Sequence, residues 1–351
     1  MHRRTFLRAG TLAGVAGLAG VAGLAGCSSL LQTEPAGQPA VLEDRPDAVY
    51  YPTHVEGMQM AGMGMADGYQ FGLMYSYPHR FWNVNGSSIQ LTEIEADDDV
   101  HLMATVFDPE TKQVLPETGL SIEIEKDGAL VSQEVIYPML SQPMGFHYGA
   151  NFGLDGDGTY DVTVSVGGMP IRRTGEFEGK FGNAASTTIE MEYSRAKRDE
   201  IMYRTTPEKA GSRAAVEPMQ MEMLPTGFAP ELDARATATS GDATVDIVVR
   251  EPPAGVDAPT YLAAVMSTPY NRMVIPAAGL AATLTRDGET VFEGELARTL
   301  DPELGYHYGA GVESVESGDT LAIEVTTPPQ VARHEGYETA FLNFEPMEVT
   351  L

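Results

Sequence analysis

Histidines and methionines that lie close together are the residues of this chain best suited to chemistry. His147 stands in the run Gly145-Phe146-His147-Tyr148-Gly149-Ala150-Asn151, with Met139 and Met144 shortly before it. Imidazole and thioether groups form a soft ligand set that favours copper, above all Cu(I). A single histidine near a turn is more often structural, so the motif alone leaves both interpretations open.

Two acidic residues and a second histidine precede this motif. Glu93 and Glu95 are two positions apart on an expected strand, which would place both carboxylates on one face, and His101 follows them. Carboxylate oxygens would extend the site towards Cu(II) or Fe(II).

A methionine-rich stretch offers further candidates at Met58, Met60, Met63 and Met65. On a strand, alternate methionines share a face and could converge on one ion. The same residues could equally fill gaps in a core, which flexible thioethers do well.

The His147 run, followed by a Gly-x-Gly-x-Tyr strand, resembles a bacterial periplasmic family of ferrous-iron transport-associated proteins. Its pattern is an E-A-D-I-H-A strand, a P-M strand, a G-P-H-Y-G-A-N loop and a late R-H pair. The resemblance implies an immunoglobulin-like β-sandwich that binds copper, iron or zinc beside an iron permease. For this chain we expect copper and/or iron as the bound ion and an iron permease or a redox protein as partner. By matching positions it implies Glu95, Met139 and His147 as metal ligands, and Glu93 stands where the family carries a histidine.

The late R-H pair departs from the family pattern. The first half of the chain has Arg172-Arg173, without the histidine, whereas the second half has Arg333-His334 and a matching His307. Thr299 and Leu304 stand in the second half where Met139 and Met144 would be. The first half therefore recruits a substitute ligand, or the halves share a site, or one half has lost binding.

These elements belong to a duplicated unit. Residues 101–150 and 261–310 align without a gap at an offset of 160, and 16 of the 50 positions are identical. A repeat this long indicates two copies of one domain. Each copy alternates polar and apolar residues, as in Ser121–Glu125, and has an Asp-Gly turn at 127–128 or 287–288. We therefore expect an all-β fold of two tandem immunoglobulin-like β-sandwiches.

The boundaries follow from composition. We expect an export signal over 1–27, a flexible stalk over 28–45, a first sandwich over 46–200, a linker over 201–215 and a second sandwich over 216–351. A short helix is expected within 193–202.

The first 27 residues predict where in the cell the protein is located. Arg3-Arg4 followed by an apolar run resembles a twin-arginine signal, and Leu24-Ala25-Gly26-Cys27 resembles a lipobox. We expect export by the twin-arginine route and a lipid anchor on Cys27 at the outer face of the cytoplasmic membrane. A retained membrane helix is the alternative, although the run is short for spanning.

Charge and cysteine content exclude several classes of function. Fifty acidic against 22 basic residues give a net charge of -28, which is unsuited to binding nucleic acid. With only five lysines, this acidic composition is typical of proteins that stay soluble in high salt, so we expect a halophilic source. The single cysteine rules out an internal disulfide and a cysteine-based zinc or blue-copper site.

Two functions remain after this exclusion. The first is a non-catalytic lipoprotein that binds copper and/or iron, and the second is a metal-free immunoglobulin-like interaction module. An enzyme is the least favoured class, because no catalytic triad or phosphate loop stands out. The oligomeric state is left open.

Overall fold

The computed structural model describes residues 39–220 and 223–351. The expected signal, the lipid attachment at Cys27 and most of the expected stalk lie outside these ranges. The rest of the expected stalk contacts the fold: the Arg80 guanidinium donates to the carbonyl of Pro39, and Arg45 pairs with Glu338 at 3.4 Å.

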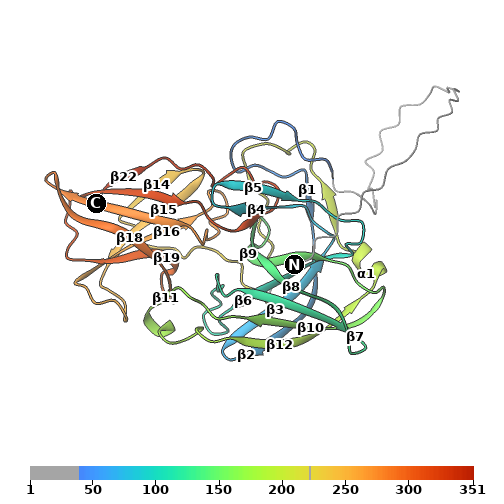
Figure 1. The fold of residues 1–351 in the computed structure, drawn as a ribbon. Coiled ribbons are helices and arrows are strands. Elements are labelled where there is room, and N and C mark those ends of the chain that lie inside the picture. The colour runs from blue at the N-terminus through green and yellow to red at the C-terminus, as the bar shows by residue number, and fades with distance from the viewer. Residues whose placement is uncertain (1–38, 221–222) are drawn as a thin grey trace, which may run out of the picture. The chain divides into compact units, whose positions relative to one another are not determined.

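The first repeat forms a sheet that curls until its end strands, β12 and β2, pack together. Its order is β12-β10-β7-β8-β9-β6-β3-β2, with the short β21, β4 and β5 attached beside β8 (Figure 1). The strands of this half of the chain are β1 (His54–Glu56), β2 (Gln59–Ala66), β3 (Tyr69–Ser76), β4 (Phe81–Asn85), β5 (Ser88–Thr92), β6 (Val100–Phe107), β7 (Leu120–Lys126), β8 (Ala129–Ser141), β9 (Gly145–Phe152), β10 (Gly158–Val166), β11 (Arg172–Arg173), β12 (Ala185–Tyr193) and β13 (Tyr203–Thr205).

The second repeat has the same architecture, in the order β14-β15-β16-β19-β18-β17-β20-β22. Its strands are β14 (Ala236–Ser240), β15 (Ala243–Arg250), β16 (Thr260–Ser267), β17 (Gly279–Arg286), β18 (Glu289–Asp301), β19 (Gly305–Val312), β20 (Thr320–Thr327), β21 (Ala332–Arg333) and β22 (Met347–Thr350). The predicted all-β fold of two tandem β-sandwiches is confirmed.

Local sequence explains the strands and the turns between them. In β7, Ile122 and Ile124 are buried while the polar residues between them are half-exposed. Asp127 and Gly128 both have positive φ, 53° and 74°, as a type I′ hairpin turn requires. In the described residues, helical structure is limited to the 3-10 turn η1 (Gly175–Phe177) and to α1 (Arg195–Asp199), which lies within the expected segment. None of the described helices is long and apolar enough to cross a membrane.

The two repeats exchange a short strand. β11, from the first repeat, pairs in parallel with β18, placing Arg172 beside Thr299. β21, from the second repeat, pairs in the same way with β8, placing Ala332 beside Met139. The expected linker is also structured in part, because β13 pairs with β1. The repeats are therefore joined by strand pairing as well as by the linker between them.

Strand β6 connects the core to the face that carries the chemistry. All eight of its residues are buried. Leu102 and Ala104 point into a hydrophobic core that runs through both repeats. His101 and Met103 alternate with them and point to the opposite face.

Candidate metal centre

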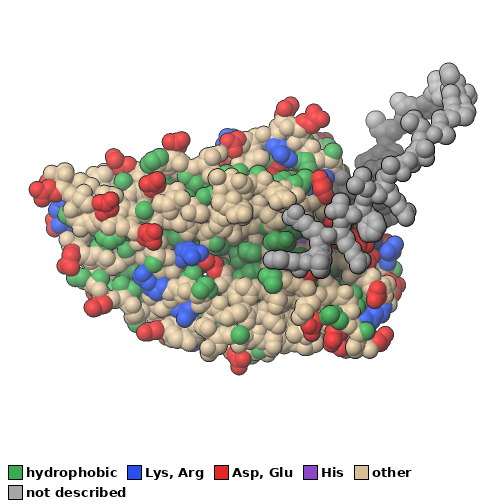
Figure 2. Space-filling view, in the orientation of Figure 1, with side chains coloured by type: hydrophobic (Ala, Val, Ile, Leu, Met, Phe, Trp, Pro, Cys, Tyr) green, Lys and Arg blue, Asp and Glu red, His purple; other side chains and the backbone are tan. Residues whose placement is uncertain are grey.

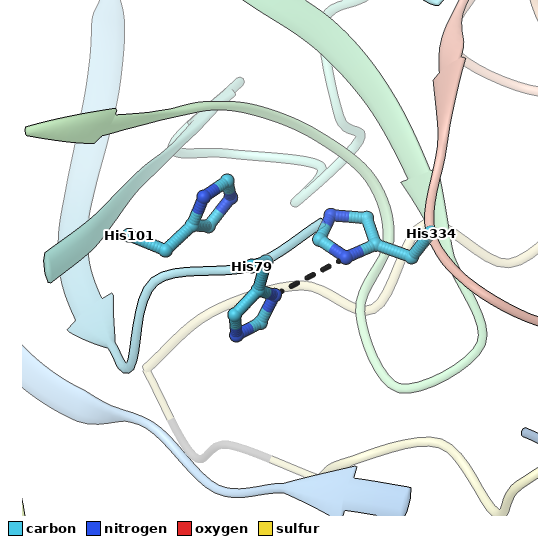
Figure 3. Close-up of side chains that lie close together, drawn as sticks. All are labelled: His79, His101 and His334. Carbon is cyan, nitrogen blue, oxygen red and sulfur yellow. Dashed lines mark hydrogen bonds between the residues drawn. The ribbon is translucent and has the colours of Figure 1, made fainter. Parts of the chain in front are cut away.

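Three histidines from separate parts of the chain meet on this face of β6. His101 lies in β6, His79 between β3 and β4, and His334 directly after β21. One ring nitrogen from each lies within 4.8 Å of the others (Figure 3). The His79 and His101 rings stack at 4.5 Å, and the His334 ring stands perpendicular to both.

The orientation of His101 is set by Asn151, its partner across the β6–β9 ladder. The Asn151 amide nitrogen donates to the His79 carbonyl at 2.9 Å, so its oxygen faces His101 Nδ1 at 2.8 Å. An amide oxygen only accepts, so His101 Nδ1 carries the proton and Nε2 keeps its lone pair. Asn151 therefore holds His101, whereas the hydroxyl of Tyr148, which lies next to His147 in β9, accepts from the Thr118 amide.

His147 and Met139 face each other across the β8–β9 ladder. His147 Nδ1 donates to the Gly145 carbonyl at 3.0 Å, which again leaves Nε2 with the lone pair. The His147 ring centre is 5.3 Å from that of His334. A Cβ at Gly149 would lie 2.6 Å from His101 Nε2 and 3.1 Å from Met139 Sδ, so the imidazole and the thioether meet over this glycine.

Glu56 and His79 complete a chain of hydrogen bonds behind His334. His79 Nε2 lies 2.5 Å from a Glu56 carboxylate oxygen, and His79 Nδ1 lies 3.2 Å from His334 Nδ1. If His79 donates to the carboxylate, it accepts from His334, whose Nε2 then keeps its lone pair. The second Glu56 oxygen lies 3.1 Å from His54 Nε2. His79 thus orients His334, as carboxylates and carbonyls commonly orient metal-binding histidines.

Burial keeps the imidazoles of His101, His147 and His334 neutral. It lowers the pKa of His147 to about 4. Burial, reinforced by the neighbouring histidines, also holds the pKa values of His101 and His334 well below the ordinary value. Burial acts to raise the pKa of Glu56, but the adjacent His79 and His54 outweigh it and lower that pKa. The site therefore combines neutral nitrogen ligands with a buried negative charge.

Three imidazole nitrogens in this cluster have no protein partner. Within residues 39–220 and 223–351, the Nε2 atoms of His101, His147 and His334 are buried without a hydrogen bond. Unpartnered polar atoms in a protein interior are costly, so their convergence calls for a ligand. Three nitrogen lone pairs beside a thioether fit a soft metal such as Cu(I).

The structure does not bring every predicted ligand here. Glu93 and Glu95 are exposed and follow the end of β5 at Thr92, in a turn where the Glu95 amide is held by Asp98. The strand expected there is absent, because this acidic run is solvated rather than paired. A pocket lies beside the histidine cluster and is lined by His147 and His334 among others. Met144 lines the same pocket.

The methionine-rich stretch is divided between the pocket and the surface. Met58 lines the pocket, Met60 and Met63 pack in a cluster beside it, and Met65 is 61% exposed. The bulge in β2 between Met60 and Gly62 breaks the simple alternation on which the prediction of four converging methionines rested.

The equivalent place in the second repeat lacks the ligands. Tyr261 replaces His101, Thr299 replaces Met139 and Thr174 replaces His334. His307 is retained, but its Nε2 is 2.8 Å from the Tyr261 hydroxyl, so it is already satisfied. His307 therefore lies apart from the cluster. The first repeat receives His334 from the second, so the histidine cluster contains residues of both repeats.

Sequence reasoning missed Glu56, His54 and His79. His54 and Glu56 are two positions apart on β1, and this spacing alone could have flagged an imidazole and a carboxylate on one face. His79 precedes an aromatic run and gave no comparable signal.

The molecular surface is consistent with the composition. Acidic side chains are spread over the visible face rather than gathered in one patch (Figure 2).

Comparisons with known proteins add limited information. A family model described as a domain of unknown function, DUF7350, matches residues 229–350. No curated protein matches the chain. Among solved structures, FetP of uropathogenic Escherichia coli strain F11 is 22% identical over 39% of this chain and 96% of its own, with a TM-score of 0.32. A copper-bound variant of Campylobacter jejuni P19 is 19% identical over 39% of this chain and 98% of its own, with a TM-score of 0.30. TM-scores at this level do not bear on function.

Proposed function

We propose that this chain is an extracytoplasmic copper-binding protein whose ligands are His101, His147, His334 and Met139. The observation that carries the proposal is that three buried, unpartnered imidazole nitrogens of the described part of the chain belong to neighbouring rings: His101 and His334 have ring nitrogens within 4.8 Å of each other, and the His147 ring centre is 5.3 Å from that of His334. A metal-free interaction module gives no reason to leave these atoms unsatisfied.

Each residue of the centre has a role in this proposal. The imidazoles and the thioether supply the soft donors that Cu(I) prefers. Asn151, the Gly145 carbonyl and His79 fix the ring tautomers so that each Nε2 faces inward. Glu56 balances the charge of the cation, and its oxygens offer a hard donor for Cu(II) or Fe(II).

The cellular setting is proposed from the N-terminal sequence. A twin-arginine signal and a lipidated Cys27 would hold the protein at the outer face of the cytoplasmic membrane. There it would pass copper and/or iron to an iron permease or to a redox partner, as the resemblance implies. In this proposal the protein carries the metal and does not catalyse a reaction.

The test is a competition titration of Cu(I) under anaerobic conditions. We expect one tight site at the histidine centre, and His334→Ala and His147→Ala should each weaken it at least tenfold. His307→Ala is the matched control, because it removes the duplicate histidine and should leave the affinity unchanged. Equal affinity in all three variants would refute the proposal.

A further inference from the structure

A row of methionines crosses three neighbouring strands next to the histidine centre. Met60 in β2 pairs with Met74 in β3, and Met74 pairs with Met103 in β6. Side chains directly opposite one another in such ladders have Cβ atoms about 5 Å apart. Met103 in turn pairs with Gly149, the glycine over which His101 and Met139 meet.

Other methionines close the same space. Met58, Met103 and Met144 all line the pocket that His147 and His334 also line. Met58, Met60, Met63 and Met144 pack against Met74 and Met103 in one cluster, together with Phe107 and Leu224. Six methionines therefore form one cluster, and three of them line the pocket.

The second repeat shows that packing alone does not require sulfur here. Val248 pairs with Ala263 at the place where Met74 pairs with Met103, and Leu304 stands where Met144 stands. These residues form the corresponding cluster, which contains no methionine among its described members. Hydrocarbon side chains thus fill this position in the repeat that has lost the histidines, and methionines fill it in the repeat that has kept them.

We propose that Met74, Met103 and Met144, with the half-buried Met58 and Met60 packed against them, form a second site for Cu(I), distinct from the histidine centre. Thioethers are neutral, soft ligands that hold Cu(I) and discriminate against Fe(II) and Zn(II). The buried carboxylate of Glu56 lines the same pocket and favours a cation there. This inference goes beyond the proposed function, because it concerns other residues and a second ion.

The test measures Cu(I) stoichiometry on the full chain under anaerobic conditions, with X-ray absorption to count sulfur and nitrogen neighbours. We expect two Cu(I) per chain. The triple variant Met74→Leu, Met103→Leu and Met144→Leu, which removes sulfur at nearly constant volume, should bind one, with nitrogen-rich coordination. The double variant His101→Ala and His147→Ala should also bind one, with sulfur-only coordination. Met65→Leu is the matched control and should bind two.

A second design guards against misfolding of the triple leucine variant. Met74→Val, Met103→Ala and Met144→Leu install the residues that the second repeat already uses at these places. Two Cu(I) retained in either triple variant, or a single Cu(I) in the unmodified protein, would overturn the inference. Failure of the proposed function is separate: the histidine variant would then keep the stoichiometry of the unmodified protein, whatever the methionine variants do.

Discussion

The proposed metal centre depends on residues that would not bind the ion themselves. Asn151 directs the lone pair of His101 into the centre and also holds the backbone of His79. Asn151→Ala should therefore weaken Cu(I) binding about 10- to 100-fold, as loss of such orienting partners does in other metal sites. A competition titration measures this, with His307→Ala as the unaffected reference. Unchanged affinity would mean that His101 needs no orientation or is not a ligand.

The burial of His307 leads to a prediction about how the stability of the fold depends on pH, which does not involve the metal. His307 is buried and its folded pKa is lowered to about 4 by burial, against about 6.5 in an unfolded chain. Between these values the unfolded state binds more protons, so the contribution of this group to stability is complete above pH 6.5 and is lost as pH falls towards 4. The loss is on the order of 3 kcal/mol.

Denaturant unfolding between pH 4 and pH 8 checks this expectation. His307→Gln should lower the free energy of unfolding near pH 7 and have a much smaller effect near pH 4, which flattens the profile. A difference between the two proteins that stays constant over this range would contradict the neutral, buried state of His307.

At the scale of elements, the exchanged strand β21 is what completes the centre. Arg333, fully buried, donates to the carbonyls of Pro329, Ala340 and Phe341 and so fixes the strand that carries His334. Arg333→Met should leave these carbonyls unpaired, cost roughly 3 kcal/mol or more and weaken copper binding by displacing His334. Arg173, its counterpart in β11, holds the carbonyls of Met169 and Ile171.

Comparing the Arg333 and Arg173 variants distinguishes a loss of fold stability from a loss of copper binding. Arg173→Met should destabilise the fold, as measured by denaturant unfolding, yet leave the Cu(I) affinity unchanged, because β11 brings Thr174 rather than a histidine to its neighbour. Equal loss of affinity in both variants would show that β21 has no special part in the centre.

The strands could be predicted from the sequence, whereas the exchange of β11 and β21 between the repeats could not. The offset of 160 identifies the duplicated strands, and alternation identifies β7 and β10, because both signals are local. The same alignment shows an Arg-His pair missing from one copy and present in the other, but a two-residue strand carries no pattern that says which sheet it joins. His334 could therefore be named from sequence, whereas its place beside His101 depends on contacts between residues more than 200 positions apart.

At the scale of the whole molecule, the repeats should unfold together. One hydrophobic core includes residues of both repeats, β11 and β21 cross between them, and the proposed metal centre would take ligands from both. Copper binding to the folded state alone should then stabilise the entire chain, by about 2.7 kcal/mol when free copper is 100 times the dissociation constant. Scanning calorimetry should show a single transition that moves to higher temperature with Cu(I). The shift should persist in full in His307→Ala and be smaller in His334→Ala, because only the second substitution removes the ligand that joins the repeats. Two transitions, of which copper moves only one, would mean that the repeats are independent and that His334 contributes nothing to the link between them.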